Sequence, residues 1–139
     1  MAKARKAWSI RPTKKKFPVS DSLKAEVETK AKDLVENVLK PKHVLPPPPA
    51  KDQRFNYIID IDSKWYRNYF YFCSTYACPG TNIISPTFEE KFVRMEHLGD
   101  GTFAIDYMRH NGQWFRIFDA LSVDESMEII QDDDAHFAP

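Results

Sequence analysis

Between residues 21 and 40, hydrophobic side chains recur every three or four positions, which is the spacing of a helix with one apolar face. The recurring positions are Leu23, Val27, Ala31, Leu34, Val35 and Val38. Ser20 to Ser22 precede them with side-chain oxygens of the kind that cap a first helical turn. Pro41 is expected to end this helix, and the prolines from 46 to 49 are expected to form a rigid connector.

From Phe55 the hydrophobic period becomes two, which predicts strands. Phe55 to Ile61 alternates with polar residues, as expected of a strand with one face in the core. A turn is expected at residues 62–64. The segment from Trp65 to Ala77 is apolar on both faces, which predicts a central strand covered on each side.

Three more strands are expected, joined by two tight turns. Residues 88–98 and 102–110 flank Gly99-Asp100-Gly101, and residues 114–118 follow Asn111-Gly112; both turns carry residues that tolerate positive φ. Ser122 and Glu125 then have the spacing of a capping box, which predicts a helix to about Gln131.

These elements predict an α+β fold: an N-terminal helix, an antiparallel meander of about five strands and a short C-terminal helix. A chain of 139 residues with 42% hydrophobic content is large enough for one domain with its own core, placed here at residues 19–131. Residues 1–18 lack apolar periodicity and are expected to form a disordered basic arm, and residues 132–139 a disordered acidic tail.

Several of these features together resemble a bacterial family known only as a domain of unknown function. They are Pro46-Pro47, the strand from Phe55 to Ile61, the Phe88-x-x-x-Phe92 strand, the Tyr107-x-Arg109-x-x-Gly112-x-Trp114 hairpin and the closing acidic helix. The resemblance extends over roughly residues 21–133. It implies a compact α+β domain and no activity.

The net charge of zero conceals an uneven distribution of charge. Residues 1–20 hold seven basic side chains and no acidic one, whereas residues 119–139 hold seven acidic side chains and no Lys or Arg. A basic arm can bind polyanions by displacing their counterions, so nucleic acid or another polyanion is the expected partner. The predicted contacts are Lys3, Arg5, Lys6, Trp8, Arg11, Lys14, Lys15 and Lys16.

A second candidate site is the hairpin that carries Arg109, His110, Trp114 and Arg116. Guanidinium and indole groups could hold a phosphate or stack on a base there. The alternative is cross-strand packing, with Trp114 in the core and Arg109 paired to Glu96 or Asp106. The aromatic strand is expected to be core material rather than a stacking platform, because only Arg67 lies within it.

No cofactor and no metal are expected. Cys73 and Cys78 are separated by four residues, and a zinc site would need His97 or His110 as further ligands, so two free thiols are the preferred interpretation. Two cysteines and the lack of a long apolar run favour a cytoplasmic protein with no membrane segment.

Enzyme chemistry is not evident in the sequence. The candidate acid/base residues are Asp60, Asp62, Glu89, Glu90, Asp106, His97 and His110. They match no nucleophile elbow, phosphate loop or HExxH motif, and solvent exposure explains the paired carboxylates Asp60 and Asp62. The leading hypothesis is therefore a non-enzymatic binding module. The alternative is a small enzyme with a cleft between helix and sheet, in which Asp60, His97 or His110 would converge.

Overall fold

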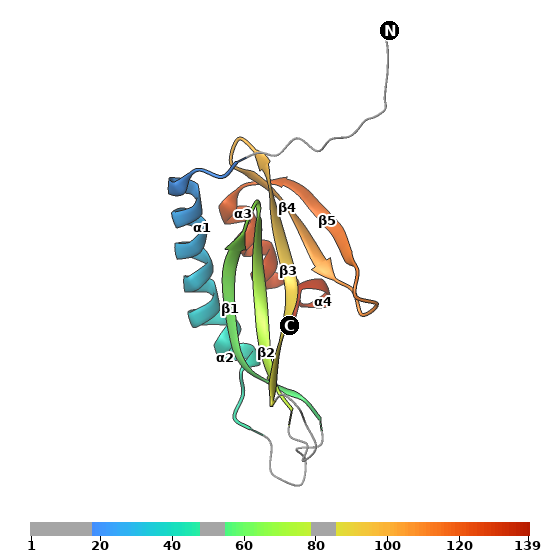
Figure 1. Cartoon of the computed structure of the whole chain (residues 1–139). Helices are drawn as coiled ribbons and strands as arrows, with labels where there is room; N and C mark the ends of the chain where they lie inside the picture. The colour runs from blue at the N-terminus through green and yellow to red at the C-terminus, as the bar shows by residue number, and fades with distance from the viewer. Residues whose placement is uncertain (1–17, 48–54, 79–85) are drawn as a thin grey trace.

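The computed structural model describes residues 18–47, 55–78 and 86–139 (Figure 1). The helices are α1 (Asp21–Leu34), the π-helical turn η2 (Val35–Leu39), α2 (Lys40–His43), α3 (Val123–Asp132) and α4 (Asp134–Phe137). The strands are β1 (Tyr57–Tyr66), β2 (Tyr69–Ala77), β3 (Thr87–Gly99), β4 (Thr102–Met108) and β5 (Trp114–Leu121). The predicted α+β fold class is confirmed.

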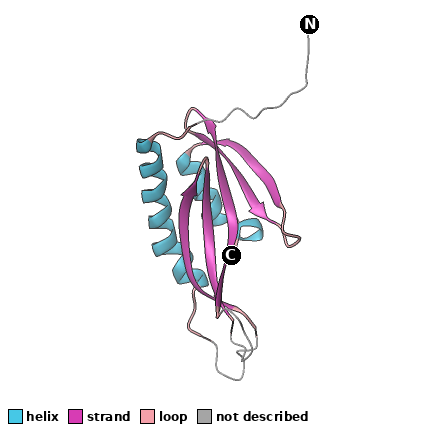
Figure 2. Ribbon diagram, viewed as in Figure 1, coloured by secondary structure: helices cyan, strands magenta, loops and turns pink. Residues whose placement is uncertain are grey.

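The five strands form one antiparallel sheet in the order β1-β2-β3-β4-β5, so each strand pairs with its neighbour in sequence. The helices gather on one side of this sheet (Figure 2). Helix α1 contacts β1 and α3, and α3 contacts β4 and β5. No helix of the described residues lies against the opposite side, which we call the open face.

A row of apolar side chains crosses the sheet on the side of the helices. Its members lie directly opposite one another on the five strands and are Trp65, Phe70, Met95, Ile105 and Phe118. At one end, the Trp65 Nε1 group donates to the backbone oxygen of Lys24 in α1 at 3.3 Å. At the other end, the Phe118 ring lies 6.4 Å from the Phe137 ring of α4. This helix-face row is the centre of the hydrophobic core.

The first helix starts as predicted but does not end at Pro41. The Ser20 hydroxyl accepts the Leu23 amide at 3.2 Å and caps the first turn. In η2 the Lys40 amide bonds to the Val35 carbonyl, five residues back, and the chain continues as α2. Pro41 occupies the first turn of α2, where a missing amide proton costs little, so this prediction was wrong.

The predicted boundary between the first two strands was also wrong. Residues 62–64 lie inside β1, which continues to Tyr66, and the turn falls at Arg67 and Asn68, with Arg67 at φ 57°. Trp65 therefore belongs to β1 rather than to β2. Polar side chains at 62 and 64 do not break the strand, because both point to the open face.

Strand β2 lies inside the sheet between β1 and β3, as an internal strand should. Among the described residues, however, helices cover only one of its faces, not both as predicted. Tyr69 and Tyr71 therefore remain half-buried on the open face, whereas Phe70 and Phe72 are fully buried beneath the helices.

The two predicted hairpin turns are present, with positive φ at Gly99, Asp100, Gly101 and Gly112. The capping box of α3 is also confirmed, since the Glu125 amide donates to the Ser122 hydroxyl and the Ser122 amide donates to the Glu125 carboxylate. The chain after α3 differs from the predicted disordered tail. It forms α4, because the Phe137 ring, 1% exposed, packs into the core.

The predicted basic arm lies outside the described residues, apart from Pro18. In the part of the chain that the structure describes, no helix combines the length and the apolar composition needed to cross a membrane.

Candidate functional site

A second row of side chains crosses the open face, one position from the helix-face row along β1 to β4 and two positions along β5, where the register shifts. Its members again lie opposite one another and are Lys64, Tyr71, Arg94, Asp106 and Arg116. Because neighbouring positions on a strand point to opposite faces, the same five strands carry an apolar row below and a polar row above. We call this second set the open-face row.

Arg94 is the centre of an aromatic and cationic patch on this face. Its guanidinium carbon lies 4.7 Å from the ring of Tyr69 and 4.7 Å from the ring of Trp114. The rings of Tyr71 and Trp114 are 5.9 Å apart, and the Lys91 ammonium lies 5.6 Å from the Tyr71 ring. The side chains come from β2, β3 and β5, so the sheet brings together groups that are far apart in sequence. We call these five residues the aromatic patch.

Asp106 fixes the two arginines of the row. Its side chain is 1% exposed, and it accepts from Arg94 Nε and from Arg116 Nε, both at 2.8 Å. Arg116 Nη2 also contacts Glu96. The hydrogen bond to Asp106, followed by that to Glu96, raises the pKa of Arg116 above its ordinary value. Asp106 thus holds both guanidinium groups in fixed orientations on the sheet.

The predicted hairpin site is divided between the two faces. Trp114 and Arg116 lie on the open face, whereas Arg109 lies 5.3 Å over the Phe115 ring and His110 is exposed in the turn. The packing alternative named Arg109 as the partner of Glu96 or Asp106, and this was wrong, because Arg116 and Arg94 make those contacts. Trp114 is half-buried beside Arg94 rather than part of the core.

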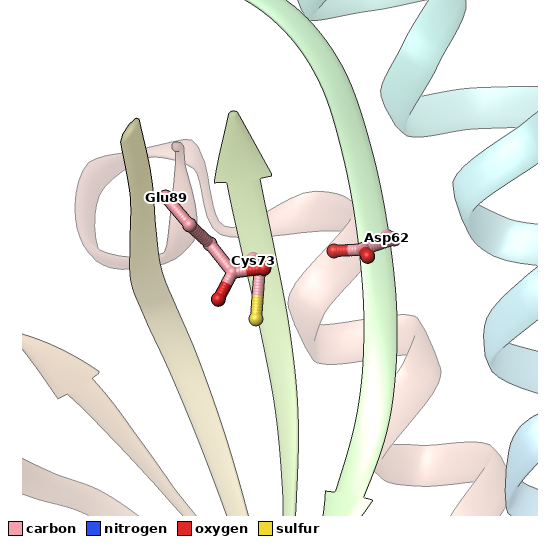
Figure 3. Close-up of side chains that lie close together, drawn as sticks. All are labelled: Asp62, Cys73 and Glu89. Carbon is pink, nitrogen blue, oxygen red and sulfur yellow. The ribbon is translucent and has the colours of Figure 1, made fainter. Parts of the chain in front are cut away.

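A separate cluster lies on the open face where β1, β2 and β3 run side by side (Figure 3). Asp62, Cys73 and Glu89 place a possible ligand atom each within 4.8 Å of one another, and they form the only such group among the described residues. Asp62 lies directly opposite Cys73 in the strand register. Burial, followed by the charge of Glu89, raises the pKa of Asp62 and raises that of the Cys73 thiol to about 11.

The other cysteine and the two histidines do not join this cluster. Cys78 follows the end of β2, and both thiols are free. His97 is buried on the side of the helices, 5.3 Å from the Phe103 ring. The zinc ligands that we considered from the spacing of Cys73 and Cys78 are therefore not brought together.

A family model described as Domain of unknown function (DUF3024) matches residues 19–139. The chain belongs to this family. The match confirms the resemblance noted from the sequence and includes every described helix and strand. No curated protein and no solved structure matches the chain.

Two grooves of this DUF3024 domain each hold two of the candidate acid/base residues, Asp60 with Asp62 and Glu90 with His110, but neither groove joins Asp60 to a histidine. Asp60 lines a groove of about 320 Å³ between the first helix and β1, where Lys40 pairs with it at 3.1 Å. His110 lines a different groove of about 410 Å³ near the C-terminus, and His97 lines neither. The convergence of Asp60, His97 or His110 that would favour an enzyme is not seen among the described residues.

The aromatic patch of the DUF3024 domain was missed in the sequence because its cations lie on another strand. Only Arg67 lies within the aromatic segment, but Lys91 and Arg94 on β3 are placed beside Tyr71 by the strand pairing. The spacing of the two cations along the chain also concealed their common face. The basic residues at 91 and 94 are three apart, and they can share a face only across a bulge, which the register shows at this point.

Proposed function

We propose that this DUF3024 domain binds single-stranded nucleic acid on the open face of its sheet. The observation that carries the proposal is the placement of Arg94 between the rings of Tyr69 and Trp114, with Tyr71 and Lys91 beside them. Aromatic rings stack on exposed bases, and guanidinium planes do the same while attracting phosphate. A sheet face bearing both groups is suited to unpaired bases rather than to a duplex.

Charge on the open face suggests a division of roles. The four cations Lys64, Lys91, Arg94 and Arg116 stand beside the four acids Asp62, Glu89, Glu96 and Asp106, so this face is nearly neutral. A neutral face can stack bases but attracts a polyanion poorly over distance. The seven basic residues before Ser20 would supply that attraction. We therefore assign stacking to the sheet and phosphate binding to the arm.

Fluorescence anisotropy with labelled oligo(dT) and oligo(U) tests this proposal. Tyr71→Ala and Trp114→Ala should each weaken binding between about fivefold and 150-fold, because stacking contributes about 1–3 kcal/mol per base. Phe115→Ala is the matched control, since Phe115 is the neighbour of Trp114 on β5, is 47% exposed and points to the opposite face. It should leave binding unchanged.

The role of the arm is tested with Lys14, Lys15 and Lys16 changed together to Ala. Binding should weaken alike for every sequence, and the slope of log affinity against log salt should flatten by about 0.7 for each phosphate of a single strand that the arm no longer neutralises. Absence of binding at low salt would overturn the nucleic-acid proposal. Binding that is weakened equally by Phe115→Ala and Trp114→Ala would overturn the assignment to the open face.

A further inference from the structure

The cluster of Asp62, Cys73 and Glu89 has an arrangement that neither the fold nor nucleic-acid binding requires. Three neighbouring strands each contribute one side chain, and in Figure 3 the two carboxylates turn toward the cysteine. Lys64 and Lys91 lie near Glu89, yet they offset the clustered carboxylates and the buried thiol only in part, because the pKa values of Asp62 and Cys73 remain raised.

The burial of Cys73 is a second observation that points to a ligand. The residue is 0% exposed, and its thiol makes no hydrogen bond with any described residue. It sits on the open face, directly across the strand pair from Asp62 and Lys91, rather than in the apolar core. One carboxylate oxygen of Asp62 and one of Glu89 lie within 4.8 Å of its sulfur, so this buried thiol adjoins two potential ligand groups.

The carboxylates of Asp62 and Glu89 each have an oxygen available to bind a cation. Lys64 donates to Glu89 Oε1 at 2.9 Å, and Lys91 lies 4.0 Å from the same oxygen. Both contacts use Oε1, so Oε2 of Glu89 remains available. Asp62 makes no hydrogen bond or ion pair with the described residues, although its pairing position places it beside Cys73.

We propose that Asp62, Cys73 and Glu89 bind a zinc ion on the open face. A thiolate is a soft ligand that selects Zn²⁺ over Mg²⁺ or Ca²⁺, and Zn²⁺ accepts sulfur and carboxylate oxygen in one site. Tetrahedral zinc holds ligand atoms about 3.5 Å apart, so atoms within 4.8 Å need to close by about 1 Å. The exposed carboxylates can make this movement while the strand fixes the thiol.

Three protein ligands leave one coordination position, which faces solvent because the open face has no helix over it among the described residues. Binding replaces the S–H bond of Cys73 with a sulfur–zinc bond, and the proton passes to the buffer. The inference is independent of the proposed nucleic-acid binding. Oligonucleotide binding by EDTA-treated protein reports on that function alone.

Cobalt and zinc titrations of the full chain test the site. Co²⁺ is the first probe, because a thiolate ligand gives a charge-transfer absorption band that carboxylates and histidines do not give. We expect one Co²⁺ per chain with this band, displaced by Zn²⁺. Cys73→Ser should abolish the band, and Cys78→Ser, which changes the other free thiol outside the cluster, should retain it.

Exposed variants test the site without disturbing the core. Asp62→Asn and Glu89→Gln should each weaken Zn²⁺ binding by more than about tenfold, because each removes one of three ligands. Asp60→Asn, two positions along the same strand and paired with Lys40, is the matched control and should change Zn²⁺ affinity less than about twofold. Circular dichroism confirms that each variant is folded.

A variant that should strengthen Zn²⁺ binding, rather than weaken it, sharpens the test. Lys64→Ala removes a positive charge 2.9 Å from Glu89, so it should tighten Zn²⁺ binding several-fold if zinc sits in the cluster. Absence of a thiolate band, loss of the band in Cys78→Ser, or equal effects of Asp62→Asn and Asp60→Asn would overturn the proposal. The expectation from the sequence that this protein binds no metal would then stand.

Discussion

The helix face and the open face of the sheet are built from the same five strands yet have opposite chemistry. One row crosses the sheet as Trp65, Phe70, Met95, Ile105 and Phe118, and the adjacent row crosses it as Lys64, Tyr71, Arg94, Asp106 and Arg116. The first row is apolar and packs into the core, with Phe70, Met95 and Ile105 fully buried, whereas the second row holds four charged side chains and Tyr71. A displacement of one residue along β1 to β4, and of two along β5, thus separates the part that stabilises the fold from the part available for binding.

The largest expected effect comes from the helix-face row. Phe70→Ala should lower the free energy of unfolding by about 3–5 kcal/mol, because it opens a cavity in the hydrophobic core. Tyr71→Ala, one position along β2, should lower it by less than about 2 kcal/mol, because Tyr71 is half-buried. Urea denaturation measures both. Equal losses would show that the two faces contribute alike to stability.

Asp106 is the exception within the open-face row, since it is buried and holds two arginines. Asp106→Asn should lower the free energy of unfolding by about 2–3 kcal/mol, because Arg94 and Arg116 lose their shared anion. Asp119→Asn, an exposed change on β5, should stay within about 0.5 kcal/mol of the wild type. A loss at Asp106 no greater than that at Asp119 would mean that the charged network adds nothing to stability.

The packing of α3 on the helix face of the sheet can also be weakened by a change at the start of α3. Ser122→Ala removes the acceptor of the Glu125 amide at the start of α3, and we expect a loss of about 1 kcal/mol. Hydrogen exchange should show the change first in α3 and not in the strand amides of β1 and β2. Faster exchange across the whole sheet would indicate that α3 and the sheet open as one unit.

The smallest effect is expected at the exposed end of the open-face row. Lys64 pairs with Glu89 at 2.9 Å, but their side chains are 46% and 35% exposed, so solvent screens the pair. Lys64→Ala should therefore change the free energy of unfolding by less than about 0.5 kcal/mol. A thermal melt is sufficient to measure it. A larger loss would show that this end of the row is part of the structural framework.

Local signals in the sequence predicted most elements of the fold. The first helix, both glycine-containing hairpin turns and the capping box at Ser122 follow from residues close together in the chain, and all are confirmed. The errors at Pro41 and at residues 62–64 arose where a local signal competes with tertiary structure. Proline fits an early helical position after a π turn, and polar residues on an open face do not end a strand.

The candidate sites were less accessible from sequence. The aromatic patch depends on the register among β2, β3 and β5, and a bulge at Phe92 on β3 brings Lys91 onto the same face as Tyr71. The Asp62, Cys73 and Glu89 cluster depends on three strands at once. Spacing along the chain contains none of this information, because pairing register is set by the packing of whole faces. The predicted arm contacts stay a prediction.

The meander also bears on how fast the chain can fold. Each strand pairs with its successor through a connection of at most nine residues, so no long crossover has to wait for a distant partner. The exception is the first helix, whose Lys30 reaches Asp124 of α3 across 94 residues of sequence. We expect the hairpins to form early and the docking of α1 on α3 to complete folding late. Changes at Lys30 should then alter the unfolding rate more than the folding rate.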